Sequence, residues 1–134
     1  MLRSRLSLLL LLPVFLLLMA FRQVPLQNPD PIAVPAKVTN EQETKAIKAA
    51  LLHRQWIIAA EKPGEVDGTL QQNEYTVRIA VSYDPQTIRI RYVDSVNLKY
   101  EKKKDGVEYI HKNYPGWIQD LARDIQSNLI LFGS

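Results

Sequence analysis

The sequence of 134 residues contains no cysteine. Disulfides, thiolate zinc sites, cysteine nucleophiles and lipid attachment through sulfur are therefore excluded. Its two histidines, His53 and His111, cannot build a metal site without carboxylates brought together from distant parts of the chain. The five glycines are scattered singly, so no glycine-rich nucleotide-binding loop is present. We therefore predict neither a metal nor an organic cofactor.

A strong excess of charge of one sign is also missing. Lysine and arginine number 17 against 14 aspartates and glutamates, and two of the cations, Arg3 and Arg5, lie in the first twenty residues. The rest of the chain therefore has 15 basic and 14 acidic residues, a net charge of +1. This balance is not typical of a nucleic-acid-binding protein, so we predict no nucleic-acid partner.

Long apolar sequence is confined to the first part of the chain, residues 1–21. Arg3 and Arg5 precede an apolar run from Leu6 to Phe21, which is the pattern of an export signal. As a helix this run would span about 24 Å, which is less than the roughly 30 Å of a bilayer core. We therefore predict an export signal or a short membrane anchor and a location in the periplasm or on the periplasmic side of the envelope. If the segment is not cleaved, it is the predicted membrane contact.

Residues 22–38 contain half of the eight prolines, which disfavour both helices and central strands. We predict that this segment is an extended spacer, with a single domain in residues 39–134. A first helix is expected from Thr39 or Asn40, with Gln42 or Glu43 as a capping-box partner, to about His53–Gln55. The apolar residues that follow, Trp56 to Ile58, indicate a buried strand that ends at Pro63-Gly64.

Residues 65–95 alternate between apolar and polar types, which predicts antiparallel strands with one apolar face. A loop at Pro85-Gln86 would place Tyr83 opposite Ile88. A loop at Asn73-Glu74 would place Leu70 opposite Val77, and both hairpins then have all apolar side chains on one side. Beyond Ser95 the pattern weakens: Leu98 and Tyr100 indicate a further strand, and the Lys102–Lys104 run indicates a solvated turn or, as an alternative, a contact with anionic lipid.

A final amphipathic helix is expected from about Asn113, with Pro115 in its first turn. Because two helices and a one-faced sheet must bury each other, the predicted fold is α+β. In detail it is a two-layer sandwich in which an antiparallel three- to four-stranded meander has N- and C-terminal helices packed on one face, in the order α-β-β-β-(β)-α. The domain is expected to be monomeric.

Two segments of this domain have a distinctive pattern. Tyr92-Val93-Asp94-Ser95-Val96-Asn97-Leu98-Lys99-Tyr100 and His111-Lys112-Asn113-Tyr114, followed by Trp117, resemble segments of a family of small proteobacterial envelope lipoproteins of unknown function. The resemblance covers roughly residues 40–128 and implies an envelope location without assigned enzymology. The sequence departs from that family at Phe21, which stands where the lipidated cysteine would be.

The outer face of the predicted sheet carries Arg78, Arg89 and Arg91. Guanidinium groups on adjacent strands bind phosphates or carboxylates, so these residues are one candidate ligand site. The simpler interpretation is a solvated face that charge protects from aggregation. The carboxylates Glu65 and Asp67 on the same face are interpreted as part of an exposed charge ladder.

Asp94, Asn97 and His111 are further candidate ligand-binding residues, since they belong to polar clusters near the ends of predicted elements. Turn formation and helix capping explain the same residue types. No catalytic residue is assigned, because no serine lies in a nucleophile motif and no triad spacing is present.

From these observations we expect an exported, lipoprotein-like envelope protein that is a non-enzymatic binding or structural module, and we expect no enzyme activity. Its partner would be an envelope protein or an anionic ligand. An alternative is a periplasmic carrier that holds a small anion on the arginine face. A small hydrolase that uses the Asp94–Asn97 and His111–Tyr114 clusters ranks third.

Overall fold

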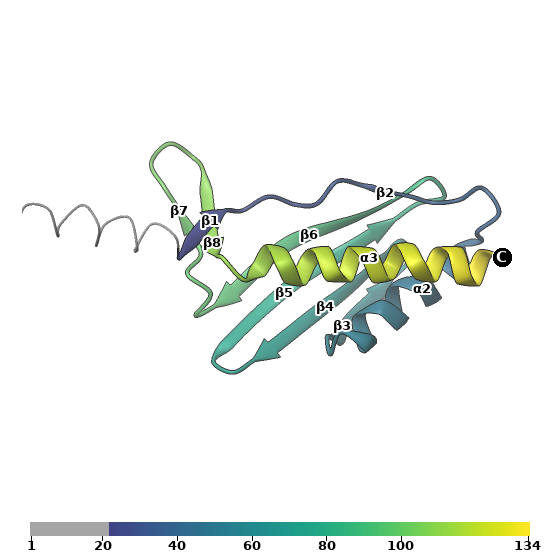
Figure 1. Ribbon diagram of the computed structural model, residues 1–134, viewed down its shortest axis with the longest axis horizontal. Coiled ribbons are helices and arrows are strands. Elements are labelled where there is room, and N and C mark those ends of the chain that lie inside the picture. The colour runs from purple at the N-terminus through teal and green to yellow at the C-terminus, as the bar shows by residue number, and fades with distance from the viewer. Residues whose placement is uncertain (1–21) are drawn as a thin grey trace, which may run out of the picture.

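The computed structural model describes residues 22–134, so the predicted export signal or anchor, residues 1–21, lies outside the described residues. The alternating segment of the chain forms an antiparallel meander of β3 (Ile57–Lys62), β4 (Glu65–Gln72), β5 (Tyr75–Tyr83) and β6 (Thr87–Val96). The short strand β2 (Ile32–Ala33) pairs with β6 and completes a five-stranded sheet in the order β2-β6-β5-β4-β3 (Figure 1).

Both predicted hairpin registers are confirmed. Tyr83 pairs with Ile88 across one turn, and Leu70 pairs with Val77 across the other. Asn73 in the β4–β5 turn has a φ of 56°, and Gly64 in the β3–β4 turn has a φ of 80°. Both residue types tolerate this left-handed backbone, which explains why the strands reverse there.

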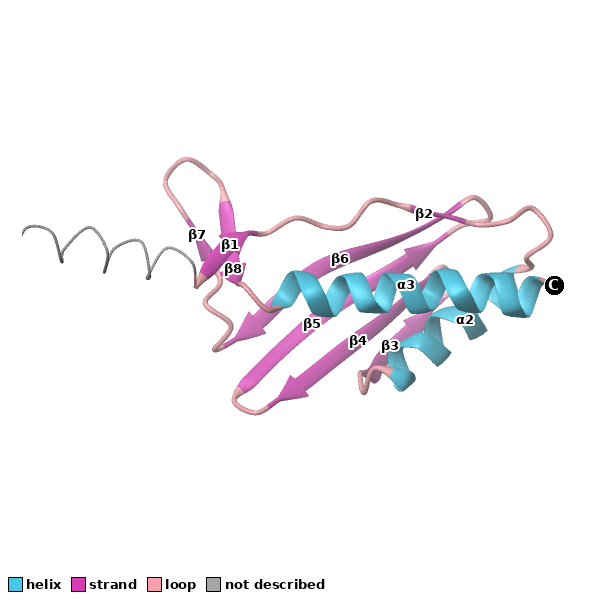
Figure 2. Ribbon diagram, viewed as in Figure 1, coloured by secondary structure: helices cyan, strands magenta, loops and turns pink. Residues whose placement is uncertain are grey.

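Two helices cover the same face of this sheet (Figure 2). Helix α2 (Asn40–His53) has Thr39 as its N-cap, and Gln42 completes the capping box, which is one of the two pairs that the sequence allowed. Helix α3 (Tyr114–Gly133) has Pro115 in its first turn. Asn113 occupies the N-cap position of α3, but its side chain makes no capping hydrogen bond. Neither of these helices, the two found in residues 22–134, is long and apolar enough to cross a membrane.

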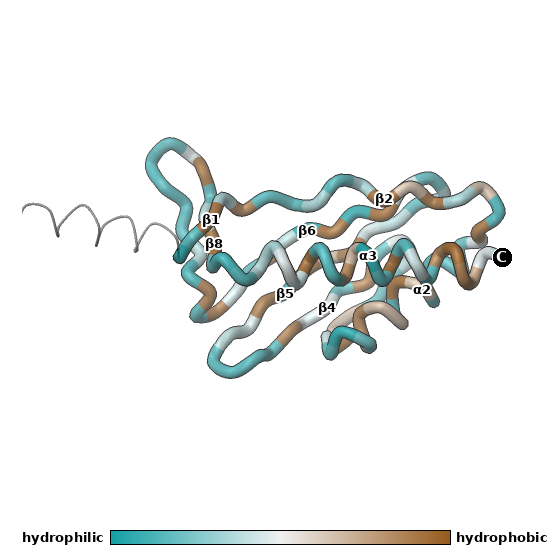
Figure 3. Tube along the Cα trace, viewed as in Figure 1, coloured by the Kyte–Doolittle hydropathy of each residue, from teal (hydrophilic) through white to brown (hydrophobic). Residues whose placement is uncertain are grey.

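The core lies between the helices and the sheet, where apolar residues recur along α3 and the central strands (Figure 3). Gly68 illustrates how close the layers are, because a Cβ atom there would lie 2.9 Å from Leu51 Cδ2. The largest fully buried apolar side chains are Ile47, Leu51, Ile79, Ile88, Leu98, Ile110, Tyr114, Leu121, Ile125 and Leu129. The predicted two-layer α+β sandwich is therefore confirmed.

The strand expected after Trp56 differs from the prediction in its environment. Trp56 is buried, but β3 is the edge strand of the sheet and most of its residues are exposed; Ile57 is 62% exposed. An apolar run alone does not distinguish an edge strand from a central one, because that difference depends on which neighbours the fold supplies.

A second, smaller sheet forms from three segments that are distant in the sequence. Strand β1 (Gln23–Pro25) pairs with β8 (Glu108–His111), which also pairs with β7 (Glu101–Lys102), in the order β1-β8-β7. The strand expected at Leu98 and Tyr100 is not found there: β7 begins only at Glu101, and it pairs with β8 instead of extending the main meander. This sheet lies at the end of the molecule opposite the C-terminal residue (Figure 1).

Residues 22–38 are extended, but they do not stand away from the domain as a spacer. Val24 pairs with Ile110 in the small sheet, and Ile32 pairs with Ile88 in the large one. Between them the Asn28 side chain accepts a hydrogen bond from the backbone N–H of Tyr92 at 3.1 Å. Prolines are compatible with this path because the segment follows a sheet edge, where missing N–H donors cost little.

Candidate functional site

The outer face of the large sheet, which the helices do not cover, carries polar residues in lateral rows. In one row Thr69 of β4 pairs with Arg78 of β5, which pairs with Asp94 of β6. In the next outward-facing row Asp67 pairs with Ala80. The residue pairs between these rows point inward, since Ile79 is fully buried in the core.

Two β-bulges lie between these rows. In β3 the register shifts between Ile58 and Ala60, so Ala59 has no partner in β4. In β6 Val93 has no partner in β5, because Arg78 pairs with Asp94 and Ile79 pairs with Tyr92. A bulge inserts an extra residue and bends its strand, which redirects nearby side chains.

Between the two bulges the outer face is hollowed. The hollow has a volume of about 150 Å³, and we call it the outer-face hollow. Its lining residues are Ala59, Ala60, Asp67, Gly68, Thr69, Arg78, Ile79 and Val93. Since liquid water occupies about 30 Å³ per molecule, the hollow is large enough for a group of a few heavy atoms.

Asp67 is the polar group at this hollow that lacks a partner. Its Oδ1 is buried and has no hydrogen-bond partner in residues 22–134. Burial raises the pKa of Asp67, the nearby Glu65 carboxyl raises that pKa further, and Lys62 and Arg91 act in the opposite direction. A buried acceptor without a donor costs free energy, and Asp67 is the lining residue of the hollow that carries this cost.

Arg78, in contrast, is already paired. Its Nε donates to Asp94 Oδ1 at 2.7 Å and its Nη2 donates to Asp94 Oδ2, a bidentate ion pair. The Arg78 guanidinium holds the pKa of Asp94 below its usual range. This pair neutralises one of the three arginines that were predicted to bind an anion.

Arg89 and Arg91 lie on the outer face of β6, two residues apart, and both are exposed. Within residues 22–134 neither forms an ion pair within 4.0 Å. Arg91 acts on Asp67 and Arg89 acts on Asp84 through longer-range attraction, since each arginine lowers the pKa of that carboxyl. The three predicted arginines therefore share a face, but only two of them are without a paired carboxylate.

The other predicted site residues do not form one cluster. Asp94 faces outward with Arg78, whereas His111 is buried on the helix side of the sheet, where its ring lies 5.4 Å from that of Tyr75. His111 Nδ1 accepts a hydrogen bond from the backbone N–H of Asn113 at 3.0 Å, and burial lowers the pKa of His111. Asn97 donates its side-chain amide to the Glu74 carbonyl at 3.2 Å. Asn97 therefore has the predicted role in a turn. The turn expected at Asp94 is not found, because Asp94 lies in β6 and pairs with Arg78, and Asn113 makes no capping hydrogen bond.

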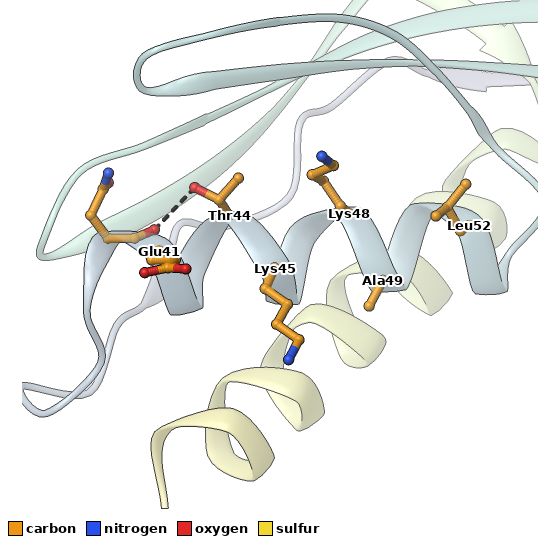
Figure 4. A pocket seen from close by; sticks show the side chains of 7 residues that line it. Glu41, Thr44, Lys45, Lys48, Ala49 and Leu52 are labelled. Carbon is orange, nitrogen blue, oxygen red and sulfur yellow. Dashed lines mark hydrogen bonds between the residues drawn. The ribbon is translucent and has the colours of Figure 1, made fainter.

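A second, open groove runs along the solvent side of α2 (Figure 4). Its volume is about 640 Å³, and Thr44, Lys48 and Leu52 follow one another along it. Lys48 is bound to Glu61 at 3.0 Å, and Lys45 lies over the Phe132 ring at 5.0 Å. Because both of its lysines already have partners and none of its lining residues is a buried polar group, this groove is a weaker candidate than the outer-face hollow.

Sequence reasoning placed Arg78 and Asp67 on the correct face but did not find the hollow. The residues it missed are Thr69, Ala59 and Val93. Alternation of apolar and polar residues predicts which face of the sheet a residue occupies. A bulge adds one residue to one strand of a pair, and the alternation does not show it when the residues around it are small or β-branched. In residues 22–134 no group of three or more histidines, aspartates and glutamates is placed to hold a metal ion.

Comparison with known proteins yields no match to a family model, a curated protein or a solved structure. The resemblance to envelope lipoproteins therefore stays a prediction. What the fold and the site define is a two-layer α+β sandwich with one uncovered sheet face and a polar hollow in that face.

Proposed function

We propose that this protein is an exported, non-enzymatic binding module of the cell envelope and that the outer-face hollow is its ligand site. The export part of the proposal is supported by the Arg3 and Arg5 pair and by the apolar run that follows them. The binding part is supported by one observation above all, the buried and unpartnered Oδ1 of Asp67, a residue that lines the hollow.

The chemistry of the hollow favours a ligand group that donates hydrogen bonds. Asp67 supplies an acceptor, and the Thr69 hydroxyl both donates and accepts. Arg78 is occupied by Asp94, so it offers little to an anion. An amine or a guanidinium therefore fits the hollow best, and charge attraction to the Asp67 carboxylate strengthens its binding.

A second candidate function is supported by Arg89 and Arg91. Both guanidiniums are exposed on one strand face and lack a paired carboxylate in residues 22–134. They would bind a small phosphate or carboxylate, which is the carrier alternative. This site differs from the hollow in both residues and ligand charge, so one experiment separates the two.

The experiment is an NMR titration of the ¹⁵N-labelled full chain in lipid nanodiscs with methylguanidinium and, separately, with inorganic phosphate. We expect methylguanidinium to shift the amide signals of Asp67–Thr69 and Ala59–Ala60. Asp67→Asn should weaken its binding about tenfold, since a hydrogen bond to a charged group contributes about 1.5 kcal/mol or more. Asp30→Asn, which changes an exposed aspartate outside the hollow, is the matched control and should leave the affinity unchanged.

The same titration tests the alternative. The anion carrier would be favoured if phosphate shifts the amide signals of Arg89 and Arg91 and if the double substitution Arg89→Gln/Arg91→Gln abolishes these shifts. No shift with methylguanidinium at Asp67, together with unchanged behaviour of Asp67→Asn, would reject the hollow as a ligand site.

Export is tested by intact-mass analysis of the protein recovered from cytoplasmic, soluble periplasmic and membrane fractions. A species that begins at Phe21 in the periplasm, or the full chain in a membrane fraction with its domain accessible from the periplasm, is expected. Recovery of the full chain in the cytoplasm alone would contradict export.

A further inference from the structure

The junction between the predicted leader and the domain is held in the small β-sheet. Strand β1 begins at Gln23, and the backbone N–H of Lys112 donates to the Arg22 carbonyl at 3.2 Å. Gln23 donates its side-chain amide to the Lys99 carbonyl at 2.8 Å. Arg22, the first residue that the structure describes, therefore lies directly beside β8.

This end of the molecule is basic. It carries six cations and three carboxylates, a net charge of +3, although residues 22–134 as a whole carry only +1. We call it the basic end; its cations are Arg22, Lys99, Lys102, Lys103, Lys104 and Lys112. In residues 22–134 none of these six cations forms an ion pair within 4.0 Å.

Neutral donors occupy the three carboxylates of the basic end. Glu101 accepts from the Gln23 amide at 3.3 Å, Glu108 accepts from the Tyr100 hydroxyl at 2.5 Å, and Asp105 accepts from the Val107 N–H at 2.9 Å. The lysines are therefore left without direct neutralisation. The positive potential reaches His111, whose pKa Lys99 and Lys112 help to lower.

The hairpin that carries the lysines has a defined shape. The backbone N–H of Lys103 donates to the Val107 carbonyl at 3.0 Å, and Gly106 turns the chain with a φ of 85°. Lys103 lies over the Tyr109 ring at 4.3 Å. Val107 and Tyr100 are each about 40% exposed beside the lysines. Lysine together with exposed tyrosine and aliphatic side chains is the composition of a surface that contacts lipid headgroups.

From this juxtaposition we infer that the basic end is a membrane-facing surface, which binds the anionic headgroups of the bilayer that residues 1–21 enter. The inference rests on the proposed export and anchoring, and it is independent of the ligand in the outer-face hollow. The β1–β8 pairing holds the lysine hairpin next to Arg22, where the leader joins the domain, so a retained leader would bring these lysines to the headgroup layer. The opposite end, with the C-terminal residue and the β5–β6 turn, then faces away from the bilayer (Figure 1).

The test places the full chain in vesicles and follows a fluorophore at either end. Because the sequence has no cysteine, Val107→Cys and Ser134→Cys each create a single labelling site at the two ends. The vesicles contain phosphatidylcholine alone or an equimolar mixture with phosphatidylglycerol, and some lipids carry a nitroxide quencher on the headgroup. We expect strong quenching at position 107 in the anionic vesicles, weaker quenching there in neutral vesicles, and none at position 134.

The charge dependence is tested with Lys102→Gln/Lys104→Gln, which leaves the Lys103–Tyr109 contact in place. A lysine near an anionic surface contributes about a fivefold factor, so the docking equilibrium constant should fall about 25-fold. The matched control is Lys37→Gln/Lys45→Gln, which removes two lysines at the opposite end of the molecule. Lys45 lies over the Phe132 ring, and Val38, the neighbour of Lys37, lies near Gly133. This control should dock as the unaltered chain does.

Salt provides a second check. Raising the ionic strength from about 0.1 M to about 1 M shortens the Debye length from about 10 Å to about 3 Å, which weakens the attraction between lysines and headgroups. The lysine hairpin should then leave the surface of the anionic vesicles. Equal quenching at position 107 in neutral and anionic vesicles, or failure of the full chain to bind anionic vesicles, would overturn the inference. Concentration-dependent shielding of position 107 without vesicles would assign the surface to a second copy of the chain and would also overturn it. Export itself is judged separately by the intact-mass measurement above.

Discussion

Glu43 is the single residue whose environment departs most from its chemistry. It lies in the first half of α2 with its side chain turned into the core, where it is 1% exposed, and neither carboxylate oxygen has a hydrogen-bond partner in residues 22–134. Burial raises its pKa from 4.5 to about 7, and the negative charge of Asp84 adds to the shift. The folded protein therefore holds Glu43 in its neutral form at mildly acidic pH.

The sign of the pH dependence follows from this shift. Since the folded pKa is above the unfolded one, the folded state binds more protons between pH 4.5 and about 7. The free energy of unfolding should therefore fall as the pH rises through this range, by up to about 3 kcal/mol. Urea unfolding across the same range measures this decline, and Glu43→Gln should remove it and make the protein more stable than the unaltered chain above pH 7.

Glu41→Gln is the matched control, because Glu41 lies on the same helix and is exposed. It should retain the decline between pH 4.5 and 7. An unchanged pH profile in Glu43→Gln would show that Glu43 is not the titrating group.

At the scale of elements, one ion-pair cluster joins the two helices. Arg54 Nε, just after α2, donates to Asp124 Oδ2 on α3 at 2.7 Å, and His53 Nδ1 lies 2.9 Å from the same oxygen. The hydrogen bond from Arg54 is the main cause that lowers the pKa of Asp124 to about 2. The cluster therefore stabilises the contact of α2 with α3 in the ionised form.

We predict that Asp124→Asn lowers the free energy of unfolding by about 1 kcal/mol at neutral pH. This is less than the free energy that corresponds to the whole pKa shift, because Arg54 is partly exposed and solvent weakens the ion pair. The folded pKa is depressed, so this stabilisation is present above pH 3.8 and is lost as the pH falls toward 2. As the pH falls from 3.8 toward 2, the free energies of unfolding of Asp124→Asn and of the unaltered chain, measured with urea, should therefore become more similar. Asp120→Asn, whose carboxylate lies 3.8 Å from Arg54, should have the smaller effect; an equal effect would contradict this account.

The elements also show where pattern reading succeeds. The hairpin registers followed from alternation, because a slip of one residue would turn every apolar side chain of a strand to the wrong face. The bulges at Ala59 and Val93 did not follow, since a bulge depends on how the strand bends against its neighbours. The outer-face hollow, which lies between these bulges, was therefore beyond the pattern.

At the scale of the whole molecule, residues 22–38 are part of the fold. Ile32 is 3% exposed and belongs to the core between sheet and helices. Ile32→Ala should lower the free energy of unfolding by about 2–4 kcal/mol, through lost burial and the cavity left behind. A spacer residue would show no such loss, so thermal or urea unfolding of this variant tests the domain boundary directly.

Gln27→Ala is the control from the same segment, since Gln27 is exposed. Its effect should stay within about 0.5 kcal/mol. If both substitutions change the free energy of unfolding equally and negligibly, residues 22–38 would be a spacer and not a part of the folded domain.

The sequence by itself determined the two-layer α+β fold, the hairpin registers, a capping box at Thr39 or Asn40 and the face that carries the arginines. These features depend on local periodicity and on neighbours close in the chain. Only the tertiary structure decided that β1 pairs with β8, that Arg78 is neutralised by Asp94, and that the hollow at Asp67 exists. Each of these depends on which distant segments share a sheet edge or a row, and hydrogen bonds between distant strands leave no periodic trace in the residues that make them.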